Sequence, residues 1–126
     1  MRRPPEQDLD KVVGPLEADV LEALWGLDRA GTVREILELV NSQRRPPLAY
    51  TTVMTVMARL ADKGILKRHR ACRGYVYEPA ASGAAAIAVR GVLKDFGSAA
   101  VAHFVEAARA DPKLLRRLEK LMRREE

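Results

Sequence analysis

Cysteine, aromatic residues and long apolar runs are all scarce in this chain. Its 126 residues include one cysteine, Cys72, which excludes an internal disulfide and any multi-cysteine metal site. Aromatic residues make up 5% of the chain, and no apolar run approaches the length of a membrane span. Arg2 and Arg3 are followed by prolines and acids instead of the apolar stretch of a secretory leader. We therefore expect a small cytoplasmic protein that does not itself bind membranes, metals or cofactors.

The residue groups on which most catalytic sites depend are also missing. The two histidines, His69 and His103, are far apart along the chain, and neither a serine–histidine–aspartate set nor paired carboxylates can be named. A glycine loop of the kind that cradles phosphates is absent too. The sequence therefore predicts a binding protein and not an enzyme.

Charge is abundant and unevenly distributed. The formal net charge is +5, yet residues 6–38 contain nine acids and three bases. Residues 44–73 contain eight bases against a single acid, Asp62. A concentrated positive band is expected of a protein that contacts a phosphate backbone, but an ordinary solvated surface would show the same pattern. Charge alone leaves both interpretations open.

Residues 49–64, AYTTVMTVMARLADKG, form an unusual helical pattern inside this basic band. On a helical wheel one side contains Val53, Val56, Met57, Leu60 and Ala61, with Met54 at its edge and expected to pack in the core. The other side presents Thr51, Thr52, Thr55 and Arg59, where stronger helix formers would be usual. Short hydroxyl side chains allow a helix to approach DNA bases closely, and their methyl groups can contact thymine. We therefore expect a recognition helix in the major groove, with Arg59 on a phosphate or a guanine.

The neighbouring segments predict two more helices and a hairpin. GPLEADVLEALWGLD is expected to begin a helix near Pro15, and GTVREILELVNSQ to begin one after a short extended piece at Thr32 and Val33. The prolines of RRPPL end the second helix, and Gly64 is expected to end the third in a left-handed conformation. ILKRHRA and GYVYEP, joined by a turn at CRG, predict a β-hairpin. This order is typical of a winged helix-turn-helix, a mainly α fold with a small β-hairpin.

The tip of the predicted hairpin is rich in arginine. Arg68, Arg70 and Arg73 are expected to contact the DNA backbone or minor groove beside the recognition helix, which positions the protein without specifying a sequence. Cations at a hydrated hairpin edge also discourage strand-to-strand aggregation, and the two roles are compatible. Tyr75 and Tyr77 alternate with a valine, so one face of their strand is expected to pack against the helices.

The last third of the chain is rich in alanine and predicts three further helices. In SAAVAHFVEAARA, the residues Val101, Phe104, Val105 and Ala108 are expected to face inward. The dipeptide of Asp111 and Pro112 then begins a helix whose apolar stripe consists of Leu114, Leu115, Leu118, Leu121 and Met122.

A helical tail of this size has too little core to fold alone, whereas two interleaved copies would supply one. We therefore expect a winged-helix DNA-binding domain at residues 1–80 and a helical dimerisation domain at residues 81–126. Its interface is expected to include Val101, Phe104, Leu114, Leu118 and Leu121. The rival arrangement folds these stripes back onto the winged helix, and it is less favoured because the first helices already use their own apolar faces there.

Four motifs, GPLEADVLEALW, TVREIL, YTTVMTVMARLADKGIL and GYVYEP, closely resemble in order and spacing those of the penicillinase-repressor (BlaI/MecI-type) transcription regulators. The resemblance covers residues 13–79, and HFVEAA extends it more weakly. It implies a homodimeric repressor of β-lactam-response or related genes that binds double-stranded operator DNA with dyad symmetry. By motif, the DNA-contacting threonines of the family fall on Thr52 and Thr55, and Thr51 occupies a position where lysine is frequent.

The same resemblance implies that proteolysis relieves repression. In the penicillinase systems a membrane sensor protease signals the β-lactam, and the repressor is cut between an asparagine and a phenylalanine in the dimerisation helices. The matching dipeptide here is His103 and Phe104, which keeps the aromatic residue and changes the one before it. Phe104 is expected to pack inward, so cleavage would require local unfolding. An intact chain during induction would instead indicate a ligand or oxidation at Cys72.

Three alternatives remain open at this point. A winged helix that binds proteins and not DNA is possible in principle, but it would have little use for a basic band beside exposed threonines. Arg2 and Arg3 fit a disordered tail better than a minor-groove arm. Cys72 fits an incidental exposed residue better than an oxidant sensor. Copper-responsive relatives of the family have clustered cysteines near the C-terminus, and this chain has none.

Overall fold

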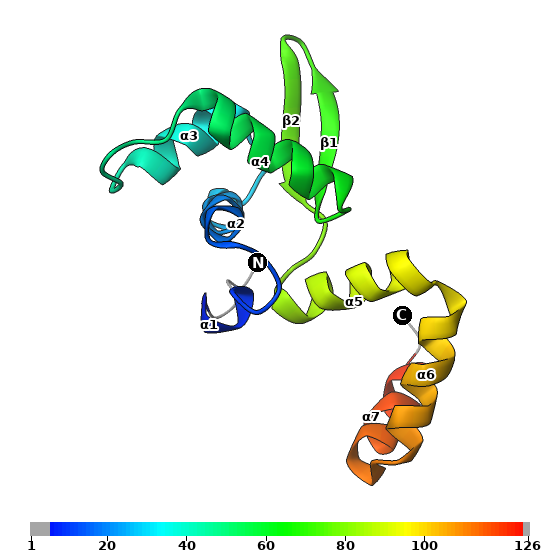
Figure 1. Ribbon diagram of the computed structural model, residues 1–126. Helices are drawn as coiled ribbons and strands as arrows, with labels where there is room; N and C mark the ends of the chain where they lie inside the picture. The colour runs from blue at the N-terminus through cyan, green and yellow to red at the C-terminus, as the bar shows by residue number, and fades with distance from the viewer. Residues whose placement is uncertain (1–5, 125–126) are drawn as a thin grey trace. The chain divides into compact units, whose positions relative to one another are not determined.

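A computed structural model describes residues 6–124 of the chain. The described residues form two compact units, and the boundary between them lies between Gly91 and Val92. The first unit contains α1 (Glu6–Leu9), α2 (Pro15–Leu27), α3 (Val33–Asn41), α4 (Tyr50–Asp62) and the antiparallel strands β1 (Leu66–Ala71) and β2 (Gly74–Pro79). The helix α5 (Ala84–Phe96) begins in the first unit and ends in the second, which also contains α6 (Ser98–Arg109) and α7 (Pro112–Arg123). Figure 1 shows the β1–β2 hairpin alongside α4. The mainly helical fold with a hairpin after the helices confirms the predicted winged helix-turn-helix.

The core of the first unit is formed by one face of each of its longer helices and by the base of the hairpin. The buried side chains from these elements are Val20, Leu21, Leu24 and Trp25 of α2, Val33 and Ile36 of α3, Val53, Val56, Met57 and Leu60 of α4, and Leu66 and Tyr77 of the hairpin. Burial of these side chains stabilises the unit, since apolar burial contributes about 25 cal/mol for each Å² removed from water. The four buried residues of α4 therefore hold one side of this helix against the other elements.

The start of α3 is held by a reciprocal cap, and the residue before the cap pairs with the hairpin. Thr32 Oγ1 accepts a hydrogen bond from Glu35 N at 3.1 Å, and Glu35 Oε1 accepts one from Thr32 N at 2.9 Å. Of the short extended piece expected at Thr32 and Val33, Thr32 is extended, and the preceding Gly31 exchanges two backbone hydrogen bonds of 2.8 Å with Tyr77. Val33 is not extended, because Thr32 serves as the cap and the helix begins directly after it.

Both ends of α4 are defined by local hydrogen bonds. Gly64 has φ 79° and donates its N–H to the carbonyl of Ala61 at 3.0 Å, which confirms the left-handed helix end. Before the helix, the side chain of Asn41 closes the connecting segment: its Nδ2 donates to Leu48 O at 3.0 Å, and its Oδ1 accepts from Leu48 N at 2.8 Å. The helix α4, which is predicted to recognise DNA, therefore begins and ends at fixed points.

The division between the two units lies within α5. Ala81 and Ile87 are buried in the core of the first unit, and Trp25 Nε1 donates a hydrogen bond to Ala81 O at 3.2 Å. The first residues of the expected dimerisation domain thus complete the core of the first unit. The functional division between residues 80 and 81 stays a prediction, whereas the compact unit extends to Gly91.

The second unit buries very little within one chain. Of the residues expected to face inward, Ala108 is buried, Val105 is half-buried, and Val101 and Phe104 are 52% and 61% exposed. Val101 and Phe104 are therefore not packed inward within the single chain, and their burial between two copies stays a prediction. Asp111 caps α7 as expected, since its carboxylate accepts a hydrogen bond from Lys113 N at 3.0 Å.

The cap of α3 generates a prediction about acid stability. Hydrogen bonds from Arg29 and from Thr32 N lower the pKa of Glu35 from 4.5 to about 2. Since the folded pKa is the lower one, this carboxylate stabilises the fold fully above pH 4.5, and its contribution is lost as the pH falls through about 2. Glu35→Gln should lower the unfolding free energy at neutral pH, because it removes the charge that pairs with Arg29. The loss should be only about 1 kcal/mol, because solvent screens this exposed pair. In the variant the unfolding free energy should also fall less steeply as the pH is lowered from 4.5 to 2 (the acid limb of the stability curve).

Urea unfolding between pH 7 and 2 measures both effects. Glu38→Gln, an exposed change on the same helix, is the matched control and should leave the acid limb as it is in the original protein. Identical acid limbs for the two variants would contradict the role given to Glu35.

Candidate nucleic-acid interface

The side of α4 opposite the core presents the residues predicted to contact DNA. Thr51, Thr55 and Arg59 are exposed, and Thr52 is half-buried. Residues four apart lie one above the other on a helix, so Thr51, Thr55 and Arg59 form a row along the exposed side of α4. The capping position, Ala49, has no side-chain oxygen, so no side chain caps the start of α4, although its carbonyl accepts from Thr52 N at 3.1 Å.

Met54 lies on the exposed edge of α4 and not in the core. Its side chain is 42% exposed, so the expectation of core packing is wrong. The reason is its place on the helix, where α4 borders a groove instead of the other helices. The groove is lined from α4 by Met54 and Tyr50, from α3 by Arg34, and from the hairpin by Arg73 and Tyr75. The recognition helix and the wing therefore share one lined groove within the first unit.

The register of the hairpin decides where the wing arginines point. Arg68 lies opposite Tyr77, and Arg70 lies opposite Tyr75. Alternate residues of a strand share a face, so both arginines lie on the same face as the buried Leu66. This is the face that packs against the helices, and the arginines continue it beyond the core. Arg73 occupies the turn with Cys72, an exposed free thiol.

Two tyrosine rings that line this groove contact arginine side chains: Tyr75 contacts two and Tyr50 contacts one. The Arg68 and Arg70 guanidinium carbons lie 4.6 and 5.5 Å from the centre of the Tyr75 ring. The Arg34 guanidinium carbon lies 5.4 Å from the centre of the Tyr50 ring. These distances are within the range of cation–π contacts. Arg34 was not identified from the sequence. The signal that could have found it is its place as a cation on the polar side of α3.

Some cations of the basic band pair with acids of α2. Lys63 Nζ lies 2.9 Å from Glu17 Oε2, so it joins the end of α4 to the start of α2. Burial raises the pKa of Glu17, but hydrogen bonds from Lys63 and from the Gly14 N–H outweigh it, and the pKa is lowered overall. Arg44 pairs in the same way with Asp19. These two cations therefore have structural partners, which separates them from the wing arginines.

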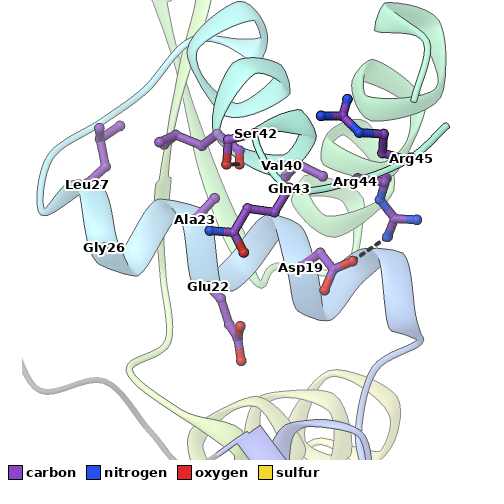
Figure 2. Close-up of a pocket in the computed structure, with 11 residues that line it drawn as sticks. Asp19, Glu22, Ala23, Gly26, Leu27, Val40, Ser42, Gln43, Arg44 and Arg45 are labelled. Carbon is purple, nitrogen blue, oxygen red and sulfur yellow. Dashed lines mark hydrogen bonds and ion pairs between the residues drawn. The ribbon is translucent and has the colours of Figure 1, made fainter. Parts of the chain in front are cut away.

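A hollow of about 800 Å³ lies between α2 on one side and the end of α3 with the segment that follows it on the other (Figure 2). The pair of Asp19 and Arg44 is drawn across it, and Leu27 and Val40 belong to its apolar part. Its lining includes no residue of α4 or of the hairpin. The hollow is therefore separate from the side chains predicted to contact DNA.

Within residues 6–124, no helix has the length and apolarity needed to cross a membrane. The same part of the chain contains no group of three or more histidine, cysteine, aspartate or glutamate side chains that could hold a metal ion. Arg2 and Arg3, the candidate minor-groove arm, lie outside the described residues.

The helices α5 to α7 expose many large apolar side chains in the single chain. These are Val89, Val92, Leu93 and Phe96 of α5, Val101 and Phe104 of α6, and Leu114, Leu121 and Met122 of α7. Leu118, also expected at the interface, is half-buried. Sequence reasoning missed the stripe of α5, because its alanines suggested close packing of small residues. The signal was the spacing of its large residues, which places them on one side of a helix.

The chain is similar to known transcriptional regulators over most of its length. The penicillinase repressor family model matches residues 13–124. Two relatives from different strains of Mycobacterium tuberculosis, each named transcriptional regulator BlaI, are 39% identical to it over 106 residues. The matched region covers 79% of this chain and 75% of each relative. Together with the winged helix-turn-helix fold, these similarities show that the chain belongs to the penicillinase repressor family of DNA-binding transcriptional regulators.

Proposed function

We propose that the chain represses transcription in the cytoplasm as a homodimer on a dyad-symmetric operator of β-lactam-response or related genes. The observation that supports this most is the exposed row of Thr51, Thr55 and Arg59 on a helix whose other side is buried. Thr52 borders this row and adds a further hydroxyl. Such a helix can enter the major groove without disturbing the core, with its hydroxyls near base edges.

The wing supplies the contact that does not depend on base sequence. Among the described residues, no salt bridge joins a carboxylate to Arg68, Arg70 or Arg73, whereas Lys63 and Arg44 have acidic partners. Arginines that keep their full charge are suited to phosphate oxygens, which fix the register of a protein on the duplex. The wing therefore complements a recognition helix that reads bases.

Dimerisation would explain the exposed apolar side chains of the tail. A soluble protein rarely exposes a large apolar surface unless another molecule covers it. A second copy of the chain satisfies this requirement and also supplies the second recognition helix that a dyad-symmetric operator needs. The interface we propose contains the expected Val101, Phe104, Leu114, Leu118 and Leu121, together with the apolar stripe of α5.

The threonines and the wing arginines should respond differently to mutation. Thr52→Ala and Thr55→Ala should each weaken binding to the operator by about 1–3 kcal/mol, because they remove contacts to base edges. Both should have a much smaller effect on a scrambled duplex. Fluorescence anisotropy with the two duplexes measures the difference. Equal losses on both duplexes would mean that the threonines contact only phosphates.

Arg70→Ala is the matched comparison from the wing. It should weaken binding to both duplexes to a similar degree and reduce the slope of log affinity against log salt by about one. A loss confined to the operator would instead make Arg70 a base contact.

A charged residue in the exposed stripe of α7 should disrupt the dimer. Leu114 is 52% exposed in the single chain, so Leu114→Glu should leave the monomer folded. Operator affinity should fall by about 100-fold, because linked half-sites gain from effective concentration. Arg116→Glu, on the polar side of the same helix, is the control. Sedimentation equilibrium reports the assembly state, and an original protein that is monomeric at micromolar concentration would rule out this part of the proposal.

We also propose the bond between His103 and Phe104 as the site of inactivating proteolysis. Both side chains are exposed in the single chain, whereas the partner would cover Phe104 in the proposed dimer. The bond lies in the middle of α6, where a protease would require local unfolding of the helix. Cleavage would remove α7 and with it a large part of the proposed interface.

Exposure of producing cells to a β-lactam tests this mechanism. An immunoblot should show two fragments that meet between residues 103 and 104, and untreated cells should keep the intact chain. A chain that remains intact while the regulated genes are induced would exclude this cleavage, and would favour a ligand or oxidation at Cys72.

A further inference from the structure

We propose that Tyr75 is a positioning residue of the wing, whose ring holds the guanidinium groups of Arg68 and Arg70 together for contact with the DNA backbone. The inference rests on the proposed DNA contact of the wing and adds a residue that does not itself need to touch DNA. It follows from the register of the hairpin and from the different neighbours on its two faces.

The hairpin register brings three side chains together on one face. Arg70 and Tyr75 are directly opposite each other across the two strands, and Arg68 is the diagonal neighbour of Tyr75. Long and aromatic side chains reach both kinds of neighbour in an antiparallel pair. The guanidinium carbons lie 4.6 Å and 5.5 Å from the ring centre, so a single ring contacts both cations. Without this ring, two like charges two residues apart on one strand would repel each other and move apart.

The opposite face of the hairpin is organised differently. There, Glu78 lies opposite Lys67, and its carboxylate is within hydrogen-bonding distance of His69 Nε2, so an acid lies beside the basic residues. A carboxylate between Arg68 and Arg70 would also hold them, but it would cancel charge and compete with a phosphate for the same N–H donors. An aromatic ring attracts a cation through its quadrupole and leaves the positive charge in place. The ring therefore orders the arginines without neutralising them.

The location of the ring matches a role beside DNA. Tyr75 is 41% exposed, whereas Tyr77 on the same face is buried in the core. Tyr75 also lines the groove to which α4 contributes Tyr50 and Met54. The arginines above the ring are thus held on the side of the hairpin nearest the recognition helix. A purely structural tyrosine would be expected inside the core, as Tyr77 is.

The test uses the full-length chain and a duplex of scrambled sequence, since backbone contacts do not depend on sequence. Tyr75→Leu keeps an apolar side chain but removes the ring, and it should weaken binding by about threefold to tenfold at low salt. Tyr75→Phe keeps the ring and should bind within about twofold of the original protein. In the double variant Arg68→Ala with Arg70→Ala, adding Tyr75→Leu should cause no further loss, because the ring then has nothing to position.

A measurement without DNA gives an independent readout. Nitrogen-15 relaxation of the arginine Nε–H groups should show more motion at Arg68 and Arg70 in Tyr75→Leu, and no change at Arg34, which contacts the Tyr50 ring. Unchanged mobility at both wing arginines would overturn the proposal.

The binding outcomes separate this inference from the proposed function. If the arginine double variant binds weakly and Tyr75→Leu binds normally, the positioning role is wrong and the wing contact stands. If Tyr75→Leu weakens binding equally with and without the arginines, Tyr75 acts by another route and the proposal is overturned. If the arginine double variant binds normally, the proposed wing contact fails and the positioning role fails with it.

Discussion

The packing of one side of α4 into the core is the constraint on which the other features depend. Val53, Met57 and Leu60 are fully or almost fully buried, so the helix has one possible orientation about its axis. That orientation exposes the threonine row and leaves the helix end at Gly64 to lead into the hairpin. β-branched residues and threonines would be a poor choice for a helix that had only to be stable. Their presence fits the proposal that this surface approaches DNA closely.

Electrostatics then divides the cations of the domain into two groups. Lys63 and Arg44 pair with acids of α2, and they stabilise the arrangement of helices. Arg68 and Arg70 contact an aromatic ring instead, so their charge is kept while their positions are restricted. A positive net charge alone does not distinguish these groups. The two groups differ in the side chain that each cation contacts, which is an acid of α2 in the first group and the ring of Tyr75 in the second.

The features that sequence could predict are those set by local periodicity and local caps. The two sides of α4, the left-handed end at Gly64 and the hairpin around Cys72 follow from residues close together in the chain. Met54 was misplaced because a residue at the edge of a helical face packs according to its neighbours in space. The contacts of Arg68 and Arg70 with the Tyr75 ring could not be predicted, because they depend on the register of the two strands. The pairing of Gly31 with Tyr77 could not be predicted either, because it joins segments that are distant in the sequence. Burial in the tail could not be predicted because it depends on what covers the helices, which is a property of the assembly.

The central claim is that the exposed side of α4 reads base sequence while the basic wing binds the backbone. Its most direct test is the affinity of the full-length protein for two duplexes at two salt concentrations, one enriched from a random pool and one scrambled. The enriched duplex should contain a palindrome and bind at least about 10³-fold more tightly, and both affinities should fall steeply as salt increases. Weak binding that is insensitive to both sequence and salt would contradict the account and would favour a winged helix that binds protein.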